Sequence, residues 1–486
     1  MPDENVDFKA TYSGAQYSTG MGLVYVFNLI VGTGALTMPS AFKEAGWLIS
    51  LITIAVLGLV SYITVTFMTE AMAIANAKLK TDAKEQSEDN CNEDQIGSVS
   101  EEFPLLQNKG SNVQLFEITQ RIEMSKMADM FFNRVGIILF NLCIIIYLFG
   151  DLSIYAVAVP KSLRDVVCTY AGINNSCNET VGDNDPCWEG VNLSRDNAYR
   201  VFVAAFLILL GPFVFFNVQK TKYLQLLTTL ARWLAFGMMI VLTIIQLAEG
   251  KGQGHPAVAS VSGIPNLFGV CVYSFMCHHS LPSLITPIRN KARLSTVLAA
   301  DYTLILVFYA LLSFTGIFTF TKIEDLYTLN FQPNECGRQA VTTVKFIEYF
   351  LALFPVFTLS TSFPIIAITL RNNLQAMLSG PTTHPLISRL LLPLLAVIPS
   401  TIVAIITNRV DFLVGITGSY AGVGIQYAIP ACLVLLARRH IDELLIKGGV
   451  QLHRSPFSHV FWVYLVLVWA ILCVVFVTIN HIINGS

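Results

Sequence analysis

The chain has 486 residues, of which only 13% are charged, and its mean hydropathy is +0.61. Soluble domains carry about 25% charged residues, so this composition excludes an ordinary soluble protein. The net charge of -2 and the lack of a basic stripe argue against a nucleic-acid partner. We therefore expect a protein that resides in the lipid bilayer.

Residues 1–20 are polar and have no basic region followed by a short apolar run and a cleavage site, so we expect a cytoplasmic tail rather than a cleaved signal peptide. The rest of the chain, 21–483, predicts an all-α integral membrane protein with eleven transmembrane helices, because an apolar stretch of about 20 residues crosses a bilayer core. The predicted spans are 21–44, 47–74, 131–159, 200–216, 223–248, 264–288, 298–320, 345–370, 388–408, 413–437 and 457–483.

Lys and Arg residues fix the predicted orientation. With a cytosolic amino terminus, most of them fall on the cytosolic side, as the positive-inside bias requires. An odd number of spans then places residues 484–486 outside the cell or in a lumen. The short basic loops that agree contain Lys220, Lys222, Arg289, Lys291, Arg293, Arg438 and Arg439.

The loop 160–199 falls on the predicted outer side. Asn174, Asn178 and Asn192 each begin an Asn-X-Ser/Thr triplet there, so we expect a glycosylated loop. Four cysteines lie on the same oxidising side and permit two disulfides in any of three pairings, or remain free thiols. These cysteines are Cys168, Cys177, Cys187 and Cys336.

The loop 75–130 falls on the predicted cytosolic side. It is rich in acidic, amide and Ser residues, so we expect it to be largely disordered and regulatory. Its sequence Glu101-Glu-Phe-Pro-Leu105-Leu106 resembles the acidic dileucine signal that clathrin adaptors bind. We therefore expect an endosomal or lysosomal membrane location, with the plasma membrane as the other option.

Glycine and proline cluster in the middle of the first span. Gly32 and Gly34 can unwind a helix, and Pro39 removes one backbone hydrogen bond. Unwound backbone and a half-helix amino terminus attract a carboxylate. The alternative is a glycine-rich face on which another helix packs closely.

The sixth span, 264–288, is interrupted at its centre in the same way. Two interrupted spans in corresponding positions of two five-helix halves indicate the binding site of an inverted-repeat transporter. We therefore expect the substrate between these spans and the third span. The predicted substrate-binding residues are Val31, Gly32, Thr33, Gly34, Tyr147, Tyr273, Ser274 and Phe275.

Two further polar groups are candidates for ion coupling. Asp151 shares a helix face with Tyr147 and Tyr155, and an acid inside the membrane indicates function unless it reaches the aqueous interface. In the eighth span, hydroxyls could complete a sodium site with carbonyls of the first span, or merely bond their own helix. These hydroxyls belong to Thr358, Ser360 and Thr361.

His278 and His279 suggest metal or acid–base chemistry, but adjacent residues point about 100° apart on a helix. No nucleophile, phosphate loop or metal-ligand spacing accompanies them. A membrane-embedded enzyme is therefore disfavoured, and we expect no catalytic residue, no metal site and no cofactor other than Na⁺ as a coupling ion. A proton-sensing role of these histidines stays open.

Four motifs, in order along the chain, resemble the amino acid/auxin permease family, which is part of the amino acid/polyamine transporter group. They are Asn28…Gly32-Thr-Gly34…Pro39…Gly46-Trp47, Phe275-Met-Cys277-His278…Pro282, Phe363-Pro364…Leu370-Arg371 and Gly415-Ile-Thr-Gly418…Ile429-Pro430-Ala431. The resemblance covers the spans and excludes 75–130. It implies a LeuT-like 5+5 inverted repeat plus one additional helix. Gly150-Asp151 departs from the sodium-coupled branch, which puts sodium coupling in doubt.

We therefore expect a secondary active transporter of amino acids or related small solutes, working by alternating access and coupled to Na⁺ or H⁺. The alternative is a non-transporting sensor that uses the same pocket and signals through 75–130. Substrate flux distinguishes the two.

Overall fold

The computed structural model describes residues 16–94, 115–170, 182–215, 222–332, 341–342, 344–378, 390–441, 444, 451 and 453–484. These residues form helices and turns, with two isolated β-bridges between Tyr17 and Ile288 and between Pro186 and Ser194. The predicted all-α class is confirmed.

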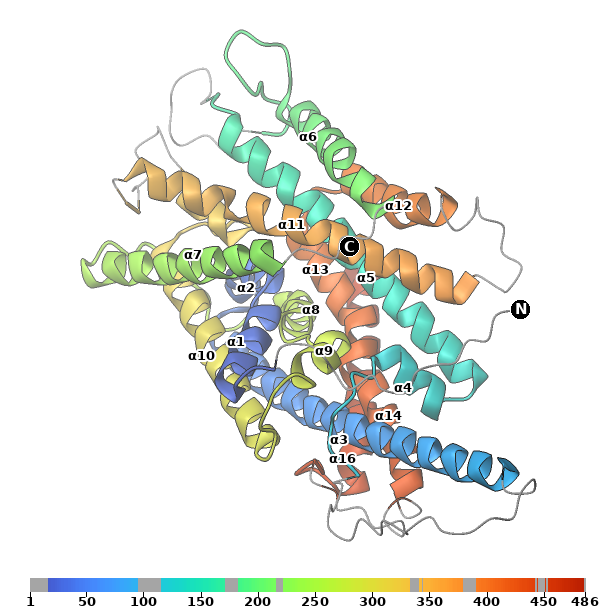
Figure 1. Cartoon of the computed structure of the whole chain (residues 1–486). Coiled ribbons are helices and arrows are strands. Elements are labelled where there is room, and N and C mark those ends of the chain that lie inside the picture. The colour runs from blue at the N-terminus through green and yellow to red at the C-terminus, as the bar shows by residue number, and fades with distance from the viewer. Residues whose placement is uncertain are drawn as a thin grey trace.

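Most helices coincide with the predicted spans (Figure 1). The exceptions are the first, sixth and tenth spans, which are interrupted, and the second, which continues to Asp94 instead of ending at 74. The main helices are α1 Thr19–Ile30, α2 Thr33–Ala45, α3 Trp47–Asp94, α4 Met124–Phe131, α5 Arg134–Val167, α6 Arg195–Leu210, α7 Lys222–Ala248, α8 Ile264–Ser274, α9 Leu281–Ile285, α10 Leu294–Thr319, α11 Lys345–Leu378, α12 Leu392–Ile406, α13 Val410–Thr417, α14 Ile429–Ala437 and α16 Val460–Asn484.

Eight helices are long and apolar enough to cross a membrane, and the bent pair α1–α2 makes nine within the described residues. The other two predicted spans form shorter helices: α12 has 15 residues, and α8 and α9 have 11 and 5. The chain is therefore a multi-pass membrane protein, while the count of eleven is not established by helix length and composition.

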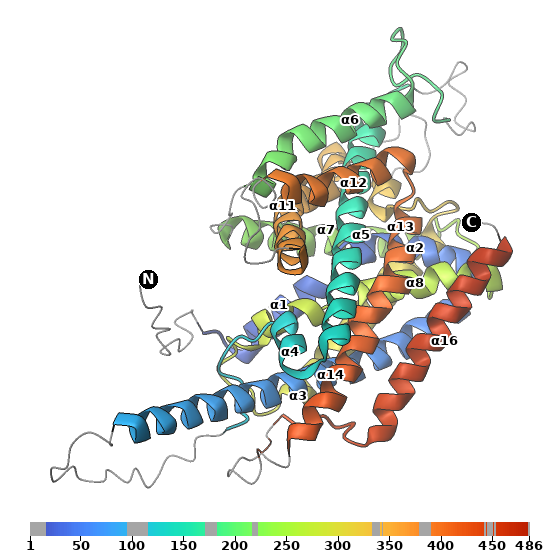
Figure 2. The ribbon, with the colours of Figure 1, turned by 90° about the vertical axis from the view of Figure 1, so that its right-hand side faces the viewer.

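Helix α8, the first half of the broken sixth span, lies at the centre of the bundle, next to α2 and α3. Helix α16 lies on the periphery of the bundle (Figures 1 and 2). Glycines let α8 approach the tenth span backbone to backbone. A Cβ atom built on Gly269 would lie 2.0 Å from the carbonyl oxygen of Gly415, and one on Gly418 would lie 1.9 Å from that of Gly269. Close helix contacts in membranes depend on such small residues, which explains the Gly415…Gly418 motif.

The tenth span is not a regular α-helix. Two π-helical turns, Gly418–Gly422 and Gly424–Ala428, separate α13 from α14. Such wide turns shift the hydrogen-bond register and occur often at functional sites. Neither hydropathy nor the positions of glycine and proline predict them.

The predicted outer side carries a disulfide between Cys168 and Cys187. Cys177 and Cys336 lie outside the described residues, as do Asn174 and Asn178. Asn192 is exposed, and its glycosylation stays a prediction. Ion pairs brace this side: Lys161 with Asp325 at 2.6 Å, and Arg164 and Arg195 with Asp165 at 2.7 and 2.8 Å.

On the predicted cytosolic side, residues 115–122 dock on α3. Asn76 Oδ1 accepts hydrogen bonds from the backbone N–H groups of Thr119 and Gln120, at 3.1 and 2.8 Å. Phe116 and Ile118 are fully buried. These residues and the extension of α3 to Asp94 lie within the loop 75–130, so a part of the predicted disordered loop is helical or docked on α3. Glu101, Leu105 and Leu106 lie outside the described residues.

The same side closes around the amino terminus. Tyr17 accepts from the N–H of Arg289 at 3.0 Å, and its own N–H donates to the carbonyl of Pro287 at 3.2 Å. Burial lowers the pKa of Lys291, and Glu117 opposes that shift. Burial and the charge of Lys291 lower the pKa of His453. The residues just before α1 and the docked segment 115–122 therefore both lie close to the chain that follows α9.

A buried ion pair ties α3 to the end of α14. Arg438 donates to both carboxylate oxygens of Glu70, at 3.0 and 2.7 Å. Gln451 Nε2 and the N–H of Ser455 also donate to this carboxylate, at 3.2 and 3.1 Å. Glu70 is fully buried, so four donors offset the cost of removing its charge from water.

Glu70→Ala should destabilise the protein, because it leaves the Arg438 guanidinium largely buried without its counter-ion. Breaking a buried pair in this way costs about 3–5 kcal/mol. Thermal unfolding of the detergent-purified protein measures the loss. Glu123→Ala is the control, because its pair with Arg121 is exposed and such pairs contribute about 1 kcal/mol or less. Equal stability of the two variants would contradict the importance of this contact.

Candidate functional site

The first span breaks at Val31 and Gly32. The N–H of Gly32 bonds to the carbonyl of Ile30 at 2.8 Å instead of to that of Asn28, four residues back. The helices on either side, α1 and α2, meet at an angle of 56°. The predicted interruption is thus confirmed, and it releases the carbonyl of Asn28 from its helical partner.

The sixth span breaks after Ser274. The N–H of Met276 bonds to the carbonyl of Tyr273 at 3.3 Å, one residue short of the α-helical pattern, and α9 begins only at Leu281. The two breaks are neighbours, because a Cβ atom on Gly34 would lie 2.2 Å from Ser274 Oγ and 2.8 Å from Ser274 Cα. Glycine at position 34 is therefore a steric requirement of this contact.

Tyr309 of α10 links the two breaks. Its hydroxyl lies 2.9 Å from the carbonyl oxygen of Ile30 and 2.9 Å from that of Ser274. A tyrosine hydroxyl carries one proton, so it donates to one of these carbonyls at a time. Tyr309 is fully buried, and the sequence analysis missed it because a tyrosine inside an apolar span carries no distinctive pattern.

Asp151 of α5 faces the second break. Its Oδ1 accepts a hydrogen bond from the hydroxyl of Tyr273 of α8, and its side chain is buried. Asp151 therefore lies inside the bundle and not at the aqueous interface, the alternative that the sequence left open. The contact joins the third span to the broken sixth span.

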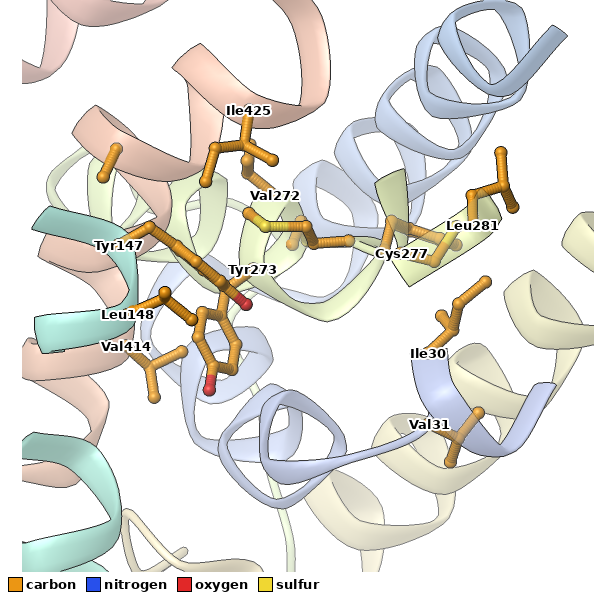
Figure 3. Packing of buried hydrophobic residues seen from close by; sticks show 14 of the residues in the cluster. Ile30, Val31, Tyr147, Leu148, Val272, Tyr273, Cys277, Leu281, Val414 and Ile425 are labelled. Atoms are coloured by element: carbon orange, nitrogen blue, oxygen red, sulfur yellow. The ribbon is translucent and has the colours of Figure 1, made fainter. Parts of the chain in front are cut away.

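Aromatic rings surround this acid. Tyr147 of α5 packs against Tyr273 with ring centroids 6.3 Å apart, and Figure 3 shows the pair across from Ile30 and Val31. Tyr155 lies close to Thr33 and to Asp151. Predicted residues of the first, third and sixth spans thus come together, and Phe275 packs beneath them against Tyr309 at 5.5 Å.

The span-eight hydroxyls donate to their own helix. Thr358 donates to the carbonyl of Phe354 at 2.9 Å, and Thr361 to that of Thr358 at 2.9 Å. Ser360 is partly buried beside them. A hydroxyl that donates its proton keeps its oxygen lone pairs, which are what a sodium ion binds, so these hydrogen bonds are compatible with both arrangements and the sodium site stays a prediction.

Arg232 is a cation in the middle of α7. Its guanidinium donates to the released carbonyl of Asn28 and interacts electrostatically with the hydroxyls of Tyr155 and Tyr309. Within the described part of the chain it forms no salt bridge. An arginine inside an apolar segment is itself a signal of function, and the sequence analysis could have used it.

His278 and His279 have different partners. His278 Nε2 pairs with the hydroxyl of Thr64 at 2.9 Å, and the ring of His279 packs on Tyr147 at 5.4 Å. Among the described residues no group of three or more His, Cys, Asp or Glu side chains is placed to hold a metal ion.

Comparison with known structures identifies the fold. The crystal structure of MhsT in complex with L-phenylalanine is similar over 96% of this chain and 99% of that chain, with a TM-score of 0.52 and 12% sequence identity. At this identity the likeness concerns the fold alone, which is of the LeuT type.

Curated relatives are similar over nearly their whole length. Transmembrane protein 104 of Gallus gallus is 51% identical over 98% of this chain and 99% of the relative. The human protein of the same name is 51% identical over 98% and 99%, and the Drosophila melanogaster homolog 47% identical over 96% and 97%. The family model for transmembrane amino acid transporter proteins matches residues 15–479. The chain therefore belongs to the transmembrane amino acid transporter protein family.

Proposed function

We propose that the chain is a secondary active transporter of amino acids or related small solutes, working by alternating access. The main support is the pair of neighbouring helix breaks, one at Val31–Gly32 and one after Ser274. They are brought together by the close contact of Gly34 with Ser274. Irregular backbone is tolerated in a membrane only within protein or beside an aqueous cavity. Family membership and the LeuT-type fold support the same function.

The substrate carboxylate binds at the start of α2. The first N–H groups of a helix have no helical partner and carry a partial positive charge, which suits a carboxylate. Gly32 leaves room there, since an added Cβ would meet nothing nearer than the carbonyl of Leu29 at 3.8 Å. The substrate ammonium binds the carbonyls released near Tyr273 and Phe275, and Tyr147 lines the side-chain end.

Transport is driven by an ion gradient. Asp151 is the candidate proton site: it faces Tyr147, Tyr155 and Tyr273, and protonation removes the charge that accepts the Tyr273 hydrogen bond. Thr358, Ser360 and Thr361 are the candidate sodium ligands. Asp151 joins α5 to α8, so a change at this contact is able to alter the position of the broken helix.

A sensor is the second candidate, and the docked segment 115–122 favours it. Asn76 and the buried Phe116 and Ile118 fasten this segment to α3, so movement of α3 would be transmitted to the preceding residues. Deletion of 95–114, which spares the docked segment, separates the functions: a transporter keeps its flux, and a sensor loses its output. Binding of an amino acid without countable flux would favour the sensor.

Gly32→Leu should abolish amino-acid uptake into reconstituted vesicles. The Cβ atom has room at the break, and the rest of the larger side chain occupies the space proposed for the substrate, so we expect flux to fall roughly tenfold or more. Gly237→Leu is the matched control, because an added Cβ at Gly237 has nothing within 4 Å and Gly237 faces outward on α7. If both variants are equally folded and Gly32→Leu takes up substrate like the wild type, the substrate does not bind at this break.

Asp151→Asn should remove stimulation by a proton gradient, because the amide cannot take up and release a proton at this site. Asparagine keeps the size and still accepts the hydrogen bond from Tyr273, so exchange of substrate across the membrane without a gradient should persist. Concentrative uptake at an imposed pH difference, compared with exchange, is the measurement. A variant that still concentrates substrate like the wild type would exclude Asp151 as the proton site.

We propose residence in endosomes or lysosomes, from the dileucine-like sequence. Changing Leu105 and Leu106 to Ala should shift the protein to the cell surface, because adaptor binding needs the leucine pair. Surface biotinylation measures the shift, and alanine replacements of Asn108 and Lys109 serve as the control. An unmoved distribution would mean that the sequence does not sort this protein.

A further inference from the structure

We propose that Arg232 permanently supplies the positive charge that a sodium ion would supply between the first and eighth spans, so that transport is independent of Na⁺. This inference rests on the proposed transport function and specifies its coupling. It starts from the carbonyl of Asn28, which the break at Gly32 releases and to which the Arg232 guanidinium donates. A carbonyl of this kind is what a sodium site in a broken helix would use.

Arg232 also lies at the same level in the bundle as the candidate sodium ligands of α11. Helices α7 and α11 are antiparallel: Gln246, near the end of α7, donates to the carbonyl of Val341, just before α11. Phe236, deeper in α7, packs edge to face on Phe354 with centroids 5.7 Å apart. Continuing this register by one turn places Arg232 at the level of Thr358, the first of the candidate sodium ligands.

Aromatic contacts of α1 and α10 surround Arg232. Phe27 of α1 stacks on Trp233 with centroids 4.4 Å apart, and Phe308 of α10 packs on both Phe27 and Phe236 at 5.5 and 5.6 Å. Tyr309, next to Phe308, bonds the carbonyl of Ile30. Arg232 therefore lies against α1, near Tyr309 of α10 and at the level of Thr358 of α11, where the predicted sodium ligands would have to converge.

Charge excludes a second cation there. Two unit charges about 4 Å apart at an effective dielectric constant of 20 repel enough to weaken binding roughly a thousandfold. The guanidinium itself is stabilised by the carboxyl end of α1, whose last carbonyls carry a partial negative charge. Because arginine stays protonated at all physiological pH values, this charge does not depend on the ion gradient.

The test uses the full-length purified protein in sodium chloride and in choline chloride of equal concentration. Thermal stability of the wild type should be the same in both salts. Arg232→Gln removes the charge and opens the site, so its stability should rise in sodium relative to choline. Arg200→Gln, an exposed arginine on α6, is the control and should show no salt difference. Sodium stabilisation of the wild type, or none of Arg232→Gln, would overturn the proposal.

Flux supplies the second readout. Wild-type uptake should be equal in the two salts, and Arg232→Gln should lose about tenfold or more in choline, while Arg232→Lys should recover part of the rate because it restores the charge. Uptake by the wild type that requires sodium would refute the inference and leave the transport function intact. Absence of amino-acid flux under any gradient would instead refute the proposed function, and the stability measurement would still decide the role of Arg232.

Discussion

A backbone group in the hydrocarbon core of a bilayer has no water to bond with, so an interruption of a helix must find its partners within the protein or in an aqueous cavity. The two breaks at the centre of this bundle obey that constraint with side chains from other spans. Tyr309 serves the carbonyls of Ile30 and Ser274, and Arg232 serves that of Asn28. The unwound segments are therefore stabilised by α7 and α10, and any conformational change at the breaks has to carry these two helices with it or replace their hydrogen bonds.

Small residues determine which helices form the rigid contacts around those breaks. Gly34 lies against Ser274, and Gly269 lies against Gly415 and Gly418, with no room for a Cβ atom. Gly150 meets Thr417 just as closely, which fastens α5 to α13. The sixth span is consequently packed against both the first and the tenth spans through backbone, and the π-helical turns that follow Thr417 lie at this crossing. Side-chain contacts such as that of Asp151 with Tyr273 are easier to change than these.

Hydropathy and the Gly-Pro pattern predicted the two broken spans, because a local interruption of helical sequence is visible without knowledge of neighbours. The shared helix face of Tyr147, Asp151 and Tyr155 also followed from helix periodicity. Sequence could not reveal Tyr309 or the docking of 115–122, since both depend on distant partners: α10 against α1, and buried Phe116 and Ile118 against α3. The π-helical turns depend on backbone register in the same way. The count of spans proved harder than their positions, because α12 and the halves of the sixth span are short.

The proposals give Arg232 and Asp151, the two charged residues near the helix breaks, different functions. An arginine keeps its charge in every state, so Arg232 is suited to hold α1 at its break and unsuited to sense a gradient. A carboxyl group gains and loses its charge, and Asp151 accepts its hydrogen bond from Tyr273 of α8, the helix that would have to move relative to α5 in the proposed alternating access. Tyr155 interacts with both groups and with Thr33, so a change of charge at Asp151 would reach the start of α2, where the substrate carboxylate is proposed to bind. The two proposals together, a permanent cation on one side and a titratable acid on the other, make the proton the driving ion that we propose.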